Sequence, residues 1–177
     1  MRHLTGGTRT AFFIFFTSHI VFTLLIDSQA LIPATHVPQF QRNILQWYTK
    51  TYNDNLMTPP HDLFLKTFVA CEILFQLPFF VVASYALRTT TPGVDGTGWF
   101  RTACLVYGSH TATTLVPILA TFYFDEAITT AERTVLFGFY LPYLIFPLWL
   151  VGIAAGSEDV FGGGRTASAA AKGGKVA

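Results

Sequence analysis

An acid and an amide interrupt a strongly apolar segment, CEILFQLPFF, at residues 71–80. Glu72 and Gln76 are four residues apart, so in a helix they lie one turn apart on the same face. Removing a carboxyl group from water is costly, and ionisable residues inside a membrane span commonly mark binding or proton-transfer sites. Glu72 is therefore the first candidate for a functional residue.

The first apolar segment of the chain ends on a second acid. Asp27, Thr23 and His19 recur at intervals of four, which places them on one face of a helix. If the two segments cross a membrane in opposite directions, both acids lie on the same side, with Glu72 roughly 8–9 Å deep at about 1.5 Å per residue. Two ionised carboxylates repel in an apolar cavity, so we expect one to stay protonated and to hydrogen-bond the other.

Such a carboxyl pair suits two kinds of chemistry. A pair that shares one proton carries about one negative charge, which matches a ligand with one cationic amine on an apolar body, and nearby aromatic rings would add cation–π attraction. Alternatively, the pair acts as acid and base on a lipid double bond. The residues also fit plainer roles, in which Glu72 and Gln76 only join helices by hydrogen bonds and Asp27 caps a helix at the membrane surface.

Hydroxyl and imidazole groups recur along the third and fourth apolar segments. The third carries a tyrosine, a histidine and two threonines on one helical stripe, and the fourth adds two tyrosines at comparable depth. The candidate ligand-binding residues are therefore Asp27, Glu72, Gln76, Thr114, Tyr143, His19, Thr23, Tyr140, Tyr107 and His110. Indirect or structural roles are predicted for Asp54, Pro78 and Pro117. We assign no catalytic residue, metal ligand or cofactor.

Four apolar segments are long enough to position these side chains across a membrane, for which a helix needs about 20 residues. They cover about 10–26, 67–87, 102–124 and 134–155, and Glu72 is the only Asp, Glu, Lys or Arg within them. Only 12% of residues are charged and 51% are hydrophobic, which argues against a water-soluble protein, and the net charge of +1 argues against a nucleic-acid partner. The sequence predicts an all-α membrane protein, a four-transmembrane-helix bundle in residues 1–156.

The connecting segments predict the orientation of this bundle. Seven Lys and Arg residues lie on the side of the two termini and four on the other side, so we expect both termini to be cytosolic. The first segment also fits a cleaved signal peptide. Within the long loop 28–66, the spacing of NILQWYTKTY at residues 43–52 predicts a short amphipathic helix at the membrane surface. The glycine- and alanine-rich residues 157–177 predict a disordered cytosolic tail.

Several long blocks resemble one known family. They match in order over roughly residues 11–150, and they are SHIVFTLLIDSQALIP (Ser18–Pro33), NILQWY (Asn43–Tyr48), CEILFQLPFF (Cys71–Phe80), WFRTACLVYGSHTATTLVPILATF (Trp99–Phe122) and YLPYLIFP (Tyr140–Pro147). These blocks are similar to the sigma-2 receptor family, also called the sigma intracellular receptor 2 or transmembrane protein 97 family. It belongs to the EXPERA group, which also contains the emopamil-binding sterol isomerase.

The resemblance implies a four-helix protein of the endoplasmic reticulum membrane, commonly a homodimer, with both termini cytosolic. It implies an occluded pocket for sterols and hydrophobic cationic amines, and it argues against signal cleavage because Asp27 matches a retained residue. By position, Asp27 resembles the aspartate that pairs with the amine, and Glu72 resembles the glutamate that hydrogen-bonds that aspartate. Asp54 matches a loop acid with an indirect role, and Gln76, Thr114 and Tyr143 match pocket positions.

The C-terminal residues differ from the family pattern. Animal members end in a lysine-rich tail suited to retrieval to the endoplasmic reticulum, whereas this chain ends in KGGKVA without adjacent lysines. The glycine- and alanine-rich tail resembles that of fungal members, which are associated with handling mitochondrial precursor proteins at the endoplasmic reticulum.

Four functions follow as alternatives. The first, which we favour over catalysis, is a receptor-like protein that binds sterols and cationic amines and influences sterol homeostasis. The second is a sterol double-bond isomerase, for which neither His19 nor His110 is expected beside Glu72. The third is a factor that handles mitochondrial precursors. The fourth is a scaffold whose polar residues only join helices and whose partners are proteins, including other membrane proteins.

Overall fold

The computed structural model describes residues 4, 6–88, 98–157 and 160–161, and the described part is helical without strands. Its helices are α1 (Gly6–Leu25), the short 3-10 helix η1 (Asp27–Ala30), α2 (Gln39–Tyr52), α3 (Leu63–Cys71), the single π turn η2 (Glu72–Gln76), α4 (Leu77–Arg88), α5 (Gly98–Phe124), α6 (Thr130–Tyr140) and α7 (Pro142–Gly156). The predicted all-helical class is confirmed.

Four continuous helical stretches in the described residues are long and apolar enough to cross a membrane, as predicted. They are Gly6–Ala30, Leu63–Arg88, Gly98–Phe124 and Thr130–Gly156. Each extends beyond the predicted apolar segment because a helix continues through polar residues wherever its backbone groups remain paired. The second stretch joins α3, η2 and α4, and the fourth joins α6 and α7. The predicted amphipathic helix is α2, which begins four residues earlier than expected.

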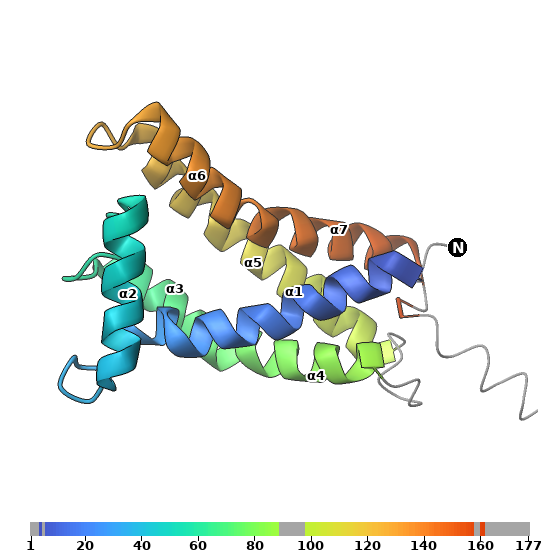
Figure 1. The fold of residues 1–177 in the computed structure, drawn as a ribbon. Helices are drawn as coiled ribbons and strands as arrows, with labels where there is room; N and C mark the ends of the chain where they lie inside the picture. The colour runs from blue at the N-terminus through green and yellow to red at the C-terminus, as the bar shows by residue number, and fades with distance from the viewer. Residues whose placement is uncertain (1–3, 5, 89–97, 158–159, 162–177) are drawn as a thin grey trace, which may run out of the picture.

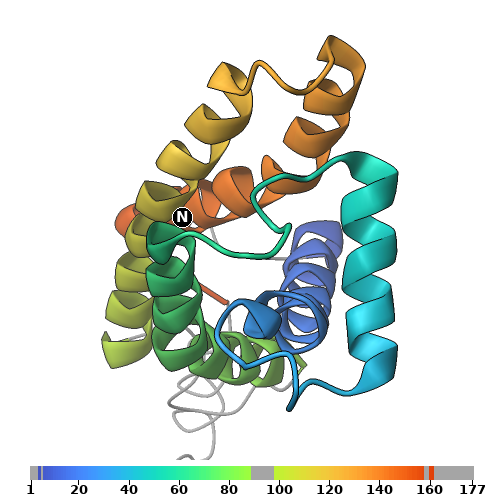
Figure 2. The same cartoon turned by 90° about the vertical axis from the view of Figure 1, so that its left-hand side faces the viewer.

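The helices form two arms that diverge toward α2. Helix α1 packs against α4, and α5 packs against α7. Figure 1 shows these pairs close together where α1 begins and α7 ends, and separated at the opposite end, where α2 stands across the opening. In the orthogonal view of Figure 2, α1, α2, α3, α5 and α6 surround the long axis of the bundle at that open end.

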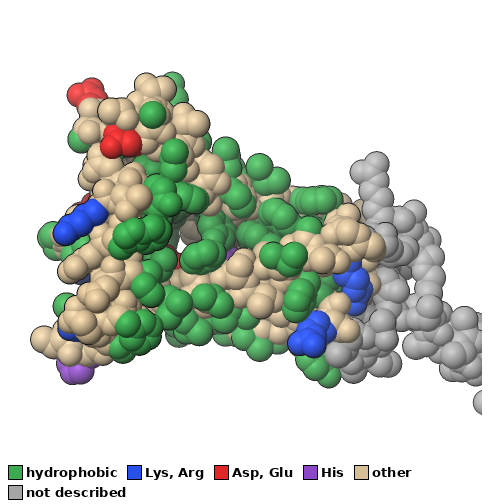
Figure 3. Space-filling view, viewed as in Figure 1, with side chains coloured by type: hydrophobic (Ala, Val, Ile, Leu, Met, Phe, Trp, Pro, Cys, Tyr) green, Lys and Arg blue, Asp and Glu red, His purple; other side chains and the backbone are tan. Residues whose placement is uncertain are grey.

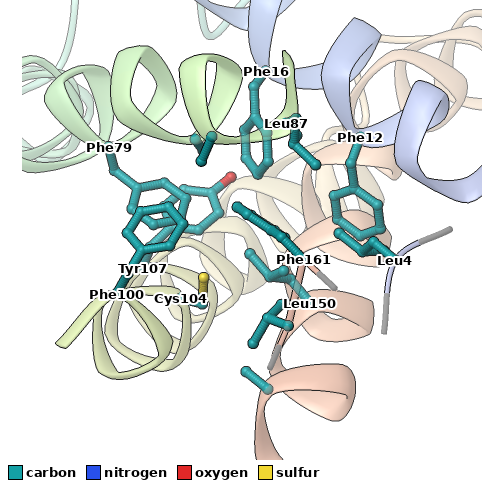
Figure 4. Packing of buried hydrophobic residues seen from close by; sticks show 14 of the residues in the cluster. Leu4, Phe12, Phe16, Phe79, Leu87, Phe100, Cys104, Tyr107, Leu150 and Phe161 are labelled. Carbon is teal, nitrogen blue, oxygen red and sulfur yellow. The ribbon is translucent and has the colours of Figure 1, made fainter. Parts of the chain in front are cut away.

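An aromatic core holds the narrow end together. Phe12, Phe16, Phe80 and Phe100 are buried there with Tyr107. Figure 4 shows the rings of Phe12, Phe16, Phe100 and Tyr107 between the helices. The Tyr107 and Phe79 rings stack with centroids 4.3 Å apart, and Tyr107 meets Phe16 edge-on at 5.7 Å. These offset and edge-to-face arrangements suit the ring quadrupoles, so the core fixes how the two arms meet.

Close contact between α5 and α7 depends on a glycine. A Cβ on Gly108 would lie 2.5 Å from Val151 Cγ2 and 2.7 Å from the Pro147 carbonyl oxygen. The second position is backbone, which cannot move aside as a flexible side chain can. Gly108 therefore sets both the distance between these helices and the rotation of α5 about its axis.

Arginine side chains satisfy the carbonyl groups at three helix C-termini. At the narrow end, Arg9 donates to the Leu87 carbonyl (2.9 Å) and the Ala86 carbonyl (3.0 Å) at the end of α4. Arg101 donates to the Ala154 carbonyl (2.7 Å) near the end of α7, and Arg133 donates to the Phe122 carbonyl (3.0 Å) near the end of α5. The last four carbonyls of a helix lack helical partners, and cations are favoured there by the helix dipole.

Two residues of the predicted disordered tail are packed against the narrow end. Val160 and Phe161 are buried in the aromatic core, and the Val160 carbonyl accepts a hydrogen bond of 2.9 Å from the Leu4 amide. The Phe161 carbonyl accepts a further hydrogen bond from Arg9. The tail prediction does not hold for these residues, because their side chains find apolar surface, and residues 162–177 lie outside the described part.

Candidate functional site

A cavity of about 400 Å³ lies at the wide end of the bundle, between the arms and beneath α2. Its wall is mostly aromatic and aliphatic, with a few polar groups. Figure 3 shows the surface hollowed between the two arms, with acidic and histidine side chains visible in the depth. The lining residues are His19, Phe22, Ile26, Asp27, Ile44, Trp47, Tyr48, Tyr52, Met57, Leu65, Phe68, Val69, Glu72, Gln76, Thr111, Thr114, Leu115, Ile118, Phe139, Tyr140 and Tyr143.

Glu72 is held by two side chains of α1. The Thr23 hydroxyl donates a hydrogen bond of 2.5 Å to Glu72 Oε1, and His19 Nε2 lies 3.4 Å from the same oxygen. Thr23 is fully buried and the Glu72 side chain is 14% exposed. A short hydroxyl-to-carboxyl bond away from water is a strong contact, so it anchors Glu72 to the first arm.

The imidazole of His19 is fixed by packing as well as by Glu72. Its ring stacks on Phe80 with centroids 4.2 Å apart and contacts the Tyr143 ring at 4.4 Å. Its Nδ1 atom is buried without a hydrogen-bond partner. A buried N–H without an acceptor costs more free energy than a buried acceptor nitrogen without a donor. We therefore assign the ring proton to Nε2, where it faces the Glu72 carboxyl group. The sequence did not place His19 beside Glu72, and the structure corrects that expectation.

The π turn η2 positions Glu72 and Gln76. The Leu77 amide donates to the Glu72 carbonyl, five residues back instead of four. Pro78 follows this turn, and a proline in a helix lacks an amide hydrogen and clashes with the carbonyl four residues before it. The wider turn accommodates that proline, and π turns of this kind are frequent at functional sites. Pro78 itself is exposed, on the outside of the bundle.

Gln76 connects the second helical stretch to α5. The Thr111 hydroxyl donates to Gln76 Oε1 at 3.1 Å, and the Thr114 hydroxyl donates to the Thr111 carbonyl at 2.9 Å. All three side chains are buried and all three residues line the cavity. With its oxygen engaged by Thr111, Gln76 presents its amide nitrogen as a donor toward the space.

Asp27 is the second acid in the cavity wall. It is half-buried at the start of η1, and no hydrogen bond joins its carboxyl group to another side chain among the residues that the structure describes. The predicted hydrogen bond between Asp27 and Glu72 is therefore not formed. Thr23, one turn earlier on the same face, occupies that position instead.

Asp54 lies behind the wall and supports two tyrosines that line it. The Tyr48 and Tyr140 hydroxyls each donate to Asp54 Oδ2 at 2.8 Å, and the Met57 amide donates to Oδ1 at 3.0 Å. Asp54 is fully buried, and these donors offset the cost of burying a carboxylate. Burial, with the charge of Asp54 beside it, raises the pKa of the Tyr48 phenol, which therefore stays a donor. The contacts tie α2 to α6 across the open end.

Most of the predicted ligand-binding residues line this one cavity. They are Asp27, Glu72, Gln76, Thr114, Tyr143, His19 and Tyr140. Thr23 lies behind Glu72 and touches the cavity only through it. The structure thus brings together polar residues from four helical stretches, while their role in ligand binding stays a prediction.

Two predicted residues on α5 lie elsewhere. Tyr107 is buried in the aromatic core and His110 is half-buried beside the Phe75 ring, with centroids 6.3 Å apart. The contact of Gly108 with α7 fixes the rotation of α5, so that Thr111 and the turns after it face the cavity instead. Pro117 is exposed like Pro78, on the outside of the bundle.

The sequence reasoning missed the part of the wall that α2 supplies, and Phe139 beside the predicted Tyr140 of α6. Ile44, Trp47, Tyr48 and Tyr52 line the cavity from α2, and Phe139 lines it from α6. The helical spacing of these α2 residues was visible in the sequence, but it predicted a helix facing the lipid rather than a lid over a cavity. Only the position of α2 across the open end distinguishes the two.

Comparison with known proteins places the chain in a family. Residues 40–152 match the EXPERA (EXPanded EBP superfamily) family. The chain is 40% identical over 149 residues to "Sigma intracellular receptor 2" of Homo sapiens, covering 78% of this chain and 81% of the relative. It is 39% identical over 148 residues to the protein of the same name from Xenopus tropicalis, covering 79% and 83%.

A more distant similarity links the chain to a yeast protein. It is 29% identical over 145 residues to "Efficient mitochondria targeting-associated protein 19" of Schizosaccharomyces pombe, covering 80% of this chain and 71% of the relative. The family match spans the helices that build the cavity from α2 to α7, and the relatives extend the similarity over most of the chain. The resemblance in the quoted blocks is thereby confirmed, and the chain belongs to the EXPERA family, with the sigma intracellular receptor 2 proteins among its relatives.

Proposed function

We propose that this membrane protein is a receptor-like binder of hydrophobic molecules that carry a single cationic amine, and of sterols. The observation that carries the proposal is the Asp27 carboxyl group, which faces an aromatic cavity without a hydrogen-bond partner among the described side chains. The other two acids are already engaged, Glu72 by Thr23 and Asp54 by two tyrosines. The N–H group of a cationic amine would donate the hydrogen bond that no described side chain donates to Asp27.

The size and wall of the cavity support a ligand of this class. A volume of about 400 Å³ falls within the range of roughly 300–1,000 Å³ typical of small-molecule sites. Tyr140, Tyr143 and Trp47 place aromatic rings in the same wall as Asp27. The π faces of these rings would attract a cation. The remaining wall is aliphatic and aromatic, which suits an extended apolar body such as a sterol.

Location and assembly complete the proposal. The name "Sigma intracellular receptor 2" of the relatives supports an intracellular membrane, and we propose the endoplasmic reticulum with both termini cytosolic. The excess of Lys and Arg on the terminal side supports that orientation. We further propose that the protein forms a homodimer and influences sterol homeostasis, which cross-linking and sterol measurements in cells lacking the protein would test.

Binding measurements with matched acid variants test the proposed site. The purified chain is reconstituted in lipid nanodiscs and titrated with a radiolabelled hydrophobic tertiary amine. Asp27→Asn keeps the shape and removes the charge, and it should weaken binding at least tenfold. Glu126→Gln, at an exposed acid outside the cavity, is the charge-matched control and should bind as the unaltered chain does. Unchanged affinity in Asp27→Asn would eliminate Asp27 as the amine partner.

One contact favours a second candidate function, sterol double-bond isomerisation. His19 Nε2 lies 3.4 Å from Glu72 Oε1 in the cavity wall, and such a histidine–carboxyl pair can deliver a proton to one carbon and remove one from another. Turnover of a sterol with an 8,9 double bond would establish it if product formation disappears in both His19→Gln and Glu72→Gln. Amine binding that persists without any product would leave the binder as the function.

The third alternative, handling of mitochondrial precursor proteins, has support from similarity alone. The yeast relative is named for mitochondrial targeting, and its similarity to this chain is lower than that of the receptor relatives. A cavity of this size suits a small ligand better than a polypeptide. We therefore place this role behind the other two.

A further inference from the structure

A second cavity lies on the other side of α2. Its volume is about 440 Å³, and its lining comes from the stretch that follows α1, one face of α2, the turn that leads into α3, and Lys66 in the first turn of α3. From α2 it takes Arg42, Leu45, Gln46 and Thr49, whereas the first cavity takes Ile44, Trp47, Tyr48 and Tyr52. Helix α2 is therefore a partition with a different cavity on each face.

The charge of this second cavity is positive. Arg42, Lys66 and His61 contribute to its lining, which contains no Asp or Glu. Asp62, next to His61 in sequence, is exposed and outside the lining. Asp54 is buried behind the first cavity, and its charge favours the protonated form of His61. The lining therefore lacks a carboxylate that would neutralise the two permanent cations.

The guanidinium of Arg42 is held in place with one edge open. Its Nη1 donates to the carbonyls of Ala34 (2.7 Å) and Val37, and its Nη2 donates to Gln39 Oε1. A guanidinium has five N–H donors, so the Nε–H and one Nη2–H remain, with no acceptor for Nε among the described residues. An Nε–H beside an Nη–H is the fork by which an arginine binds two oxygens of a phosphate.

Lys66 adds a second cation near the start of the second membrane stretch. It is half-buried, and within the described residues no ion pair includes its amine. Two of the membrane stretches meet this cavity at their ends, Gly6–Ala30 at its C-terminus and Leu63–Arg88 at its N-terminus. Lipid phosphates lie just outside the hydrocarbon layer, so the cavity is at their depth. Leu31 and Ile32, each about two-fifths exposed, give its rim an apolar edge.

We propose that this second cavity binds a phosphate group, through the open edge of Arg42 and the amine of Lys66. The phosphate belongs to a lipid headgroup whose chains follow the apolar rim, or to a free phosphate compound. In either case the ligand differs in charge from that of the first cavity, so one protein would bind a cation and an anion on opposite faces of α2. This site is independent of the proposed amine and sterol binding.

Soluble probes separate these sources. The full chain in neutral detergent is titrated with dihexanoyl phosphatidic acid, then with inorganic phosphate, and binding is measured by microscale thermophoresis. Dihexanoyl phosphatidylcholine is the probe of equal chain length without net charge, and it should bind at least fivefold more weakly. Phosphate that displaces the phosphatidic acid would identify the phosphate group alone as the ligand. Failure to displace it would identify a phospholipid, whose chains then contribute.

Two lysine variants provide the decisive comparison. Lys66→Gln should weaken phosphatidic acid binding about fivefold, the effect of roughly one basic residue at an anionic lipid. Lys50→Gln removes the same charge from an exposed position on α2 outside both cavities, and it should change binding less than twofold. Equal losses in both variants, or equal binding of phosphatidylcholine, would overturn the proposal in favour of general surface charge.

A third variant tests the Arg42 fork separately from its charge. Arg42→Lys keeps the cation but removes the two-donor edge, so phosphatidic acid binding should fall while the salt dependence persists. The melting temperature of each variant, followed by circular dichroism, reports whether it is folded. If Lys66→Gln and Arg42→Lys both keep full phosphatidic acid affinity, the second cavity is not a phosphate site.

Discussion

The bond between Thr23 and Glu72 should be one of the strongest single polar contacts between the arms of this protein. Thr23→Val replaces a fully buried hydroxyl by a methyl group of nearly the same size, so it removes the donor without opening a cavity. Removing one partner of a buried hydrogen bond, so that the other is left unsatisfied, costs about 1–3 kcal/mol. For a chain of this length, about 1 kcal/mol shifts the melting temperature by roughly 2–4 °C, which predicts a decrease of roughly 2–12 °C.

A double-mutant cycle isolates this contact from other effects of the substitution. Thermal unfolding of the purified chain is followed by circular dichroism for Thr23→Val, Glu72→Met and the double variant. Because replacing both partners by apolar groups is nearly neutral, Thr23→Val should have little effect when Glu72 is already Met. Thr113→Val is the matched control, since its exposed hydroxyl bonds only the Ser109 carbonyl of its own helix. An equal decrease in melting temperature with and without Glu72 would refute the assigned bond.

Three further predictions concern packing, the buried loop acid and pH. Gly108→Ala should lower stability by about 1–3 kcal/mol in a denaturant titration, since its Cβ would meet the Pro147 carbonyl at 2.7 Å. Asp54→Asn should lower the free energy of unfolding by about 1–3 kcal/mol in the same assay, because an amide NH₂ replaces one oxygen that accepts hydrogen bonds. An unaltered denaturation midpoint would contradict these hydrogen bonds. Burial lowers the pKa of His61, so its stabilising contribution is present above the ordinary value of about 6.5 and is lost as pH falls through the lower folded value. The melting temperature of His61→Gln should therefore decrease less between pH 7.5 and pH 5 than that of the unaltered chain. Identical pH profiles would show that His61 does not contribute to the pH dependence of stability.

The two cavities give α2 more than one role. The mostly aromatic face of this helix covers the first cavity. Asp54 links the helix to α6, because it accepts hydrogen bonds from both Tyr48 and Tyr140. The opposite face of α2 carries Arg42 into the second cavity. Movement of α2 would therefore alter both cavities together, and binding in one should be measured with and without a ligand in the other.

Local properties of the sequence were sufficient for the helices and for the polar positions along them. Apolar length identifies a membrane helix because every backbone polar group in lipid must be paired within the segment, and a helix does this without a partner. The four-residue spacing of His19, Thr23 and Asp27 likewise places them on one face whatever surrounds the helix. Both features hold in the structure, as does the helix predicted from the spacing of Trp47 and its neighbours.

Contacts between helices were decided only by the tertiary structure. Glu72 bonds Thr23 and meets His19 instead of bonding Asp27, because the packing of α1 on α4 brings an earlier turn of α1 beside it. Tyr107 is part of the core rather than the cavity, since the approach of α5 to α7 at Gly108 fixes the rotation of α5. Residue spacing defines a face but not its direction, and direction depends on side chains far away in sequence. The acids of this protein could be found from the sequence, while their partners required the packed helices.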